Sequence, residues 1–185
     1  MAFKYMDQYR KAAPIYGAYI GCMWIAAFIC MANTIVLPAL SLAGLGIGIG
    51  SVLAIVVFAY QFFWKICQGD LSFSRSWLLV LQIIVYASIL MAFGIFIYMK
   101  FLDSGNFSAY YEQMLQDPAT RQLMDQMLAN SGVTSEEFVD QFISISPIDL
   151  ALSMMESCII LGFIGSIPLA LLSRIKFGSK TENNK

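Results

Sequence analysis

The chain carries no charged residue from Ala12 to Trp64. One helical crossing of a bilayer needs about 20 apolar residues, so this segment is too long for a single crossing. Pro38 and the glycines that follow it lie near the middle of the segment, where they predict a turn. The segment therefore predicts two membrane-spanning helices joined by a short connection.

Two further stretches have the composition of membrane spans. No charged residue lies between Arg75 and Lys100, and Glu156 is the only one between Asp149 and Arg174. Hydrophobic residues make up 59% of the 185 residues and charged residues only 12%, unlike a soluble domain. We therefore predict an all-α fold, an integral membrane four-helix bundle that forms a single domain over residues 1–185. The predicted spans lie at about residues 13–37, 44–64, 76–99 and 150–173.

Basic and acidic residues are segregated along the chain. Every lysine and arginine except Lys100 and Arg121 lies before residue 76 or after residue 173, whereas the segment 102–148 is acidic. With four spans, these two sets fall on opposite sides of the membrane, and basic segments stay on the cytoplasmic side. We therefore predict that both termini are cytoplasmic and that 102–148 is an extracytoplasmic loop.

The loop 102–148 has the pattern of short amphipathic helices rather than of a disordered linker. Asp117 followed by Pro118 is typical of a helix start, and Thr134 with Glu137 matches a capping box. We expect two or three such helices to form a small extracytoplasmic cap. Their apolar faces can rest on the bilayer, on the spans or on a partner, and the sequence does not choose among these.

Small residues recur at helical spacing within the predicted spans, which lets helix backbones approach closely. We expect most of these residues to pack within this chain. By contrast, we expect Leu79 of the third span to face lipid. The predicted helix-packing residues are Gly17, Gly21, Gly44, Gly46, Gly48, Gly50, Cys158, Gly162 and Ser166.

Glu156 is an acid inside the fourth span, where a charged side chain is costly and marks a candidate functional site. Ser153 shares its helix face, and Asn33 of the first span matches it best in depth. We predict that Glu156, Asn33 and Ser153 form an intramembrane polar site. Two interpretations stay open: a structural hydrogen bond from Glu156 to Asn33, or a proton or ligand site open to the outside.

The chain has four cysteines and no histidine. No cysteine pair has the spacing of metal ligands, and no histidine is present as a ligand or general base. We therefore expect no catalytic residue, no cofactor and no metal site. The expected partners are membrane lipids and either another membrane protein or a second copy of the chain, and not nucleic acid.

Several motifs occur in an order that is similar to a known family. Gln68-Gly69-Asp70-Leu71-Ser72-Phe73-Ser74 opens the third span, Ile97–Asp103 closes it, Tyr111–Leu115 is rich in Gln and Met, and Ser146-Pro147 precedes the last span. Ser74 and Ser104 stand where that family usually has glycine and proline. This order resembles the bacterial membrane family called domain of unknown function 4199. The resemblance implies a four-span protein of the bacterial cytoplasmic membrane and brings no catalytic residues with it.

Three functions follow from these features. The small-residue faces and the amphipathic loop favour a non-enzymatic scaffold or accessory subunit that packs against a membrane partner. The alternative is a small transporter or lipid-handling protein that uses Glu156, although Ile160 and Phe163 continue its helix face without a polar track. A membrane enzyme is the weakest hypothesis, because the acids of the loop lie at solvated helical positions.

Overall fold

The structure is a computed structural model that describes residues 6–69, 72–103, 105–128 and 132–175. Within these residues the secondary structure is helical, without strands. Asp70, Leu71 and Ser104 of the family-like motifs lie outside the described residues. The long helices are α1 (Met6–Ala32), α2 (Ala39–Gln61), α3 (Phe73–Ile97) and α7 (Pro147–Leu172). The short helices are α4 (Asn106–Gln116), α5 (Pro118–Leu128) and α6 (Ser135–Ser144), and π-helical turns extend α2 (η1, Phe62–Ile66) and α3 (η2, Tyr98–Leu102).

In the described part of the chain, four helical stretches are long and apolar enough to cross a membrane. Their mean hydropathy lies between 1.8 and 2.4. They are Lys11–Ala32, Ala39–Ile66, Phe73–Leu102 and Pro147–Leu172. The all-α fold with four membrane-length helices is therefore confirmed.

The first two helices have different bounds from those expected. Helix α1 ends at Ala32, and the backbone N–H groups of Val36 and Leu37 donate to the carbonyl oxygen of Asn33 (3.1 and 3.3 Å) in the connecting turn. Helix α2 begins at Ala39, so its glycines lie inside the helix and not at its start. Helical hydrogen bonding in an apolar setting outweighs the weak helix preference of glycine, because unpaired backbone groups are costly there.

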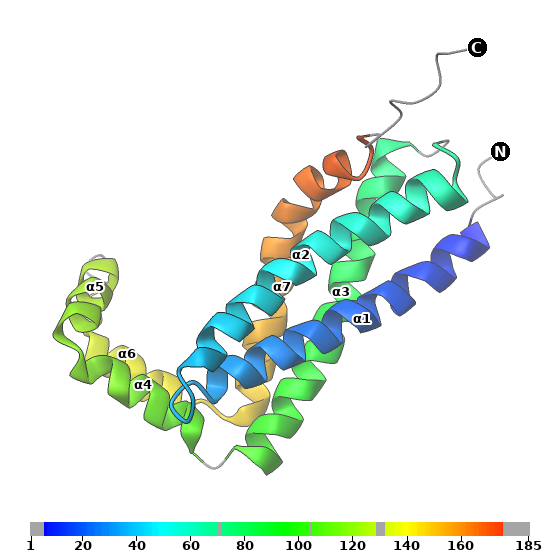
Figure 1. The fold of residues 1–185 in the computed structure, drawn as a ribbon. Coiled ribbons are helices and arrows are strands. Elements are labelled where there is room, and N and C mark those ends of the chain that lie inside the picture. Colours follow the sequence, from blue (N-terminus) through cyan, green and yellow to red (C-terminus); the bar gives the residue numbers. More distant parts are fainter. Residues whose placement is uncertain (1–5, 70–71, 104, 129–131, 176–185) are drawn as a thin grey trace.

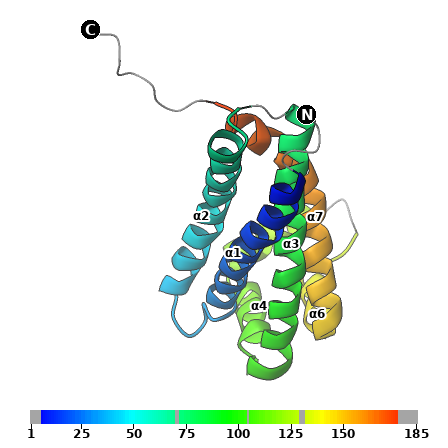
Figure 2. The ribbon, with the colours of Figure 1, turned by 90° about the vertical axis from the view of Figure 1, so that its right-hand side faces the viewer.

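Helix α3 is the centre of the arrangement. Its main packing partners are α1 on one side and α7 on the other, and α2 packs chiefly on α1 (Figures 1 and 2). Half of its most apolar stretch (50%) is buried inside the protein, compared with 11% for α7. The remaining surface of the outer helices is therefore available to lipid or to partners.

The four long helices share a core at one end only. At the end where α1 begins and α7 ends, which we call the terminal end, Ile20, Phe62, Val80 and Ala170 belong to one buried cluster. At the opposite end, which we call the cap end, the buried clusters of described residues come from α1, α3 with η2, α4 and α7, without α2. Helix α2 therefore leaves the common core as it approaches the cap end.

The expectation that Leu79 faces lipid is wrong. Its side chain is 1% exposed and belongs to the core cluster of the terminal end. The third span is uniformly apolar, so its sequence alone does not distinguish a core position from a lipid-facing one. The central position of α3 buries Leu79.

Helices α4 to α6 form a cap beside the ends of α1 and α3 (Figure 1). The predicted helix starts are confirmed, because the backbone N–H groups of Thr120 and Glu137 donate to Asp117 Oδ2 (3.2 Å) and Thr134 Oγ1 (3.2 Å). Glu137 Oε2 in turn accepts from the Thr134 backbone N–H (3.1 Å). The hydrogen bonds from Thr120 lower the pKa of the Asp117 carboxyl, since they favour its charged form.

Candidate functional site

A polar cluster joins the cap to the membrane helices. The amide nitrogen of Asn33 donates to the hydroxyl oxygen of Tyr98 (2.6 Å) and to the carbonyl oxygen of Ile29 (2.8 Å). The amide nitrogen of Asn106, at the start of α4, donates to the amide oxygen of Asn33 (3.1 Å). Asn33 therefore connects the end of α1 with η2 and with the first turn of the cap.

Aromatic contacts support this connection. Phe107 of α4 is buried, with its ring centroid 6.0 Å from that of Phe28 in α1 and 5.0 Å from that of Tyr111. Burial raises the pKa of the Tyr111 phenol, because the charged form is disfavoured away from water. The cap is therefore fixed on the membrane helices through α4, by both polar and apolar contacts.

The predicted hydrogen bond between Glu156 and Asn33 is absent among the described residues. Glu156 and Ser153 are both exposed, whereas the hydrogen bonds of Asn33 go to Tyr98, Ile29 and Asn106. Asn33 lies at the cap end, where the adjacent Ala32 packs in one cluster with Leu150, and its partners there are Tyr98 and Asn106. Asn106 was missed because its position depends on the path of the loop after α3.

Glu156 lies on the outer surface of α7, nearer the middle of the helix than to either end. Its neighbours on the same face, Leu152 and Ile160, are also exposed. A charged acid at the centre of a span costs about 3 kcal/mol on insertion scales. Among the described residues, the Glu156 side chain is exposed on the outer surface of a helix long and apolar enough to cross a membrane.

Three of the predicted glycines on α1 and α2 make close helix contacts. A Cβ atom at Gly17 would lie 2.5 Å from Tyr86 Cβ, and one at Gly21 would lie 3.0 Å from the carbonyl oxygen of Ala87. A Cβ atom at Gly44 would lie 3.1 Å from the carbonyl oxygen of Ala27. Gly17 and Gly21 therefore allow α1 to approach α3, and Gly44 allows α2 to approach α1.

The small residues of α7 also contact α3. A Cβ atom at Gly162 would collide with Ile84, and Ser166 Oγ accepts a hydrogen bond from Trp77 Nε1 (2.7 Å). Gly94 of α3 was missed by sequence reasoning, since no small residue lies three or four positions before or after it. A Cβ atom there would lie 2.5 Å from Ile25 Cδ1.

Two of the predicted packing glycines have no neighbour in the described residues. Nothing lies within 4 Å of a Cβ atom built at Gly46 or Gly48, and Gly50 meets only Met23 Cε at 3.8 Å. Just beyond them, Ser51 Oγ accepts a hydrogen bond from Trp24 Nε1 (2.8 Å), which holds α2 to α1. The glycine-rich part of α2 therefore keeps open surface beside its contact with α1.

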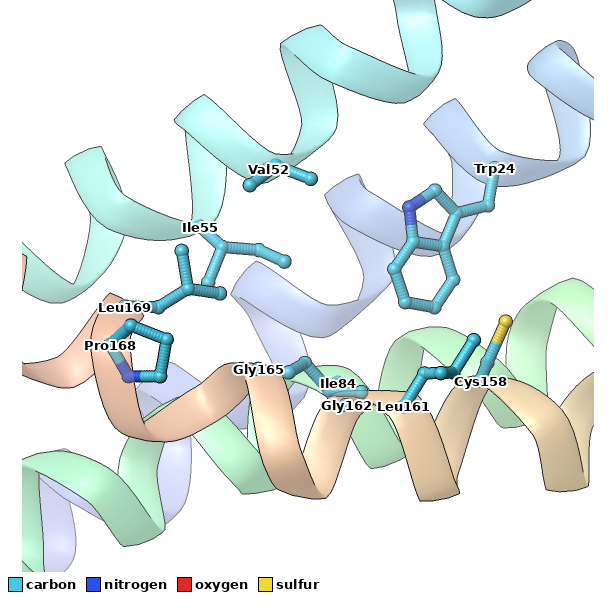
Figure 3. Close-up of a pocket in the computed structure, with 10 residues that line it drawn as sticks. All are labelled: Trp24, Val52, Ile55, Ile84, Cys158, Leu161, Gly162, Gly165, Pro168 and Leu169. Atoms are coloured by element: carbon cyan, nitrogen blue, oxygen red, sulfur yellow. The ribbon is translucent and has the colours of Figure 1, made fainter.

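A partly open groove of about 370 Å³ lies between α2 and α7 (Figure 3). Val52 and Ile55 of α2 face Leu161 and Gly165 of α7 across it, and Cys158 also lines it. The surface that lines the groove is entirely apolar. Glu156 is not among its lining residues, so the groove and the acid are separate features of α7.

Among the described residues, no group of three or more His, Cys, Asp and Glu side chains is placed to hold a metal ion. The candidate functional features described above are instead helix surfaces: the groove, the unpacked glycines and the exposed acid. Four apolar helices of membrane length define it as a multi-pass membrane protein. A family model described as "Protein of unknown function (DUF4199)" matches residues 15–174, and the chain belongs to this family. No curated protein and no solved structure matches the chain.

Proposed function

We propose that the chain is a non-enzymatic scaffold or accessory subunit that packs against another membrane protein through the open side between α2 and α7. The observation that carries this proposal is the separation of α2 from the common core toward the cap end. It leaves an apolar groove at membrane depth between two helices. A transmembrane helix of a partner has the shape and polarity to lie along this groove.

The small residues beside the groove support the proposal. Gly48 lies one turn before Val52 and therefore on the same side of α2, and Gly165 lies on the α7 wall. Neither has an atom within 4 Å of a built Cβ. Small residues at a lipid-exposed surface let a second backbone approach closely, and close packing drives helix association in membranes.

We expect Gly48→Leu to reduce the assembly of this chain with its membrane partner by about tenfold. Gly46→Leu is the matched control, because residues two apart point to nearly opposite sides of a helix and both positions accept a Cβ. The measurement is the mass and composition of complexes purified from native membranes in mild detergent. Equal recovery of a stoichiometric partner with both variants would contradict the proposal.

The alternative function is a small transporter or lipid-handling protein that uses Glu156. The apolar groove favours the lipid-handling form, since a hydrocarbon chain suits such a lining. The absence of Glu156 from the lining residues counts against a role for this acid in the same site. The accessory role therefore explains more of the exposed surface of α2 and α7, because it accounts for both the groove and the unpacked Gly48 beside it.

We also infer that the protein lies in the cytoplasmic membrane of a bacterium, with the cap outside and both termini inside. Lys65, Arg75 and Arg174 belong to the terminal end, and basic residues next to spans stay on the cytoplasmic side. The cap carries most of the acids of the described chain.

This topology predicts opposite labelling of two introduced cysteines in intact cells. In a chain whose native cysteines are replaced by alanine, Gln126→Cys should react with a membrane-impermeant maleimide. Ser74→Cys should react only after the cells are opened, because it lies at the first turn of α3. Both side chains are exposed, so burial does not explain a difference. Labelling of Ser74→Cys alone in intact cells would contradict this topology and show that the terminal end lies outside.

A further inference from the structure

We propose that the outer face of α7 around Glu156 is a second contact surface, which binds a transmembrane helix that carries a lysine or arginine at the same depth. This inference deepens the proposed function, since it names the chemistry of the partner. It rests on that function only in requiring a membrane-protein partner. It uses a different surface, because Gly165 in the groove lies on the opposite side of α7 from Glu156 at about 100° per residue.

The Glu156 side chain is exposed on an apolar face of α7. Leu152, Ile160 and Phe163 lie four residues before, four after and seven after Glu156, and therefore share its face. Their side chains are 49%, 57% and 50% exposed. Toward the terminal end this face borders α3, because the ring centroid of Phe163 lies 5.5 Å from that of Trp77, whereas Leu152 and Ile160 on either side of Glu156 are open. Glu156 therefore lies within a surface that only lipid or another protein can cover.

Among the described residues, no lysine or arginine pairs with Glu156. The four spans carry no lysine or arginine near the depth of Glu156, because Lys11, Lys65, Arg75 and Arg174 belong to the terminal end. Lys100, near the cap end, lies over the rings of Phe96 and Phe101 at 5.3 and 5.5 Å. In the described residues the one ion pair is between Arg121 and Glu136 of the cap.

Two polar side chains lie beside Glu156. Ser153 and Ser157 are exposed next to Glu156 on α7 and add two hydroxyl groups to an otherwise apolar surface. Hydroxyls can accept hydrogen bonds from an ammonium or guanidinium group that also pairs with the carboxylate. The three side chains together offer oxygen atoms to a cationic side chain within the membrane.

Charge complementarity distinguishes the candidate occupants. A second copy of the chain would bring another Glu156 and no cation at this depth, so two copies meeting here would place like charges together. Lipid acyl chains offer no hydrogen bond or charge. A different membrane protein with a basic residue in its span is the occupant that neutralises the acid, as intramembrane charges generally pair with one another.

The test uses a synthetic polyleucine transmembrane helix with one lysine placed at the depth of Glu156. The full-length chain with a donor fluorophore at its C-terminus is reconstituted with the acceptor-labelled helix in phosphatidylcholine vesicles. We expect energy transfer above that of random mixing. The association constant obtained from this transfer should fall by about tenfold when lysine is replaced by leucine in the helix or when Glu156 is replaced by glutamine. The charge-reversed pair, Glu156→Lys with a glutamate-bearing helix, should restore it.

The outcomes separate this inference from the proposed function. Equal transfer with the lysine and leucine helices, or Glu156-dependent self-association of the chain, would overturn the inference. Glu156→Gln should keep the melting temperature of the wild type, so that loss of binding is not loss of folding. Gly48→Leu should still bind the lysine helix. If Gly48→Leu and Gly46→Leu recover equal amounts of native partner while the lysine helix binds through Glu156, the proposed groove fails and this contact surface stands.

Discussion

Replacement of Gly17 by leucine should destabilise the protein more than any other single substitution considered for its spans. A Cβ atom at this position would lie 2.5 Å from Tyr86 Cβ and 3.0 Å from the carbonyl oxygen of Ile83. Neither atom is the end of a flexible side chain, so α1 and α3 must move apart to accept the new group. Overpacking of a well-packed contact costs about 1–3 kcal/mol, and a whole leucine at a backbone contact should reach at least the upper part of that range.

The measurement is the thermal unfolding of the purified protein in mild detergent. Gly46→Leu is the matched control, since the same substitution is made at a helical glycine with nothing within 4 Å of a built Cβ. Its effect should stay within about 0.5 kcal/mol, as for other exposed positions. Similar losses of stability in the two variants would show that Gly17 is not a close contact between α1 and α3.

Replacement of Asn33 by leucine should detach the cap locally from the membrane helices. It removes the hydrogen bonds to the Tyr98 hydroxyl and the Asn106 amide, and leaves the mostly buried Tyr98 without this donor. An unsatisfied buried polar group costs about 1–3 kcal/mol. The amides of α4 should therefore exchange with solvent about tenfold faster or more, as measured by hydrogen-exchange mass spectrometry, while those of α3 at the terminal end keep their protection.

Thr34→Val provides the control for this experiment. Thr34 is the next residue in the same turn, but its hydroxyl donates only within the end of α1, to the carbonyl oxygen of Cys30 (3.3 Å). This variant should leave the exchange of α4 unchanged. If Asn33→Leu also leaves α4 fully protected, the cap is held by its aromatic contacts, such as that of Phe107 with Phe28, and the polar cluster contributes little.

Local signals predicted the elements that depend on neighbouring residues. Charge-free stretches of sufficient length predicted the four membrane helices, because each crossing has to be apolar over about 20 residues. Asp117 and Thr134 predicted the starts of α5 and α6, because the hydrogen bonds of a helix cap join residues two or three apart. Gly17 and Gly21 were also identified as packing residues from their spacing alone.

The candidate site was predicted less completely. Glu156 was identified from the sequence because an acid is unusual in any apolar span, and the free-energy cost of placing it in the membrane is high whatever the fold. Its hydrogen-bond partner does depend on the fold. The choice of Asn33 was wrong, because Asn33 is hydrogen-bonded to Tyr98 and Asn106. Likewise, Gly48 has the same spacing from Gly44 as Gly21 has from Gly17, yet Gly48 has no neighbour. The spacing identifies a surface that permits close packing, but not the helix that fills it.

The sequence by itself determined which segments enter the membrane, where the cap helices begin and which residues are unusual at membrane depth. These properties follow from hydrophobicity, charge and short-range hydrogen bonding. The tertiary structure alone decided that α3 is central, that Leu79 is buried and that α2 leaves the core to open a groove against α7. The physical reason is that lipid is as apolar as leucine, so hydrophobicity cannot mark which side of a membrane helix meets protein. That choice depends on the fit of side chains from helices far apart in the sequence.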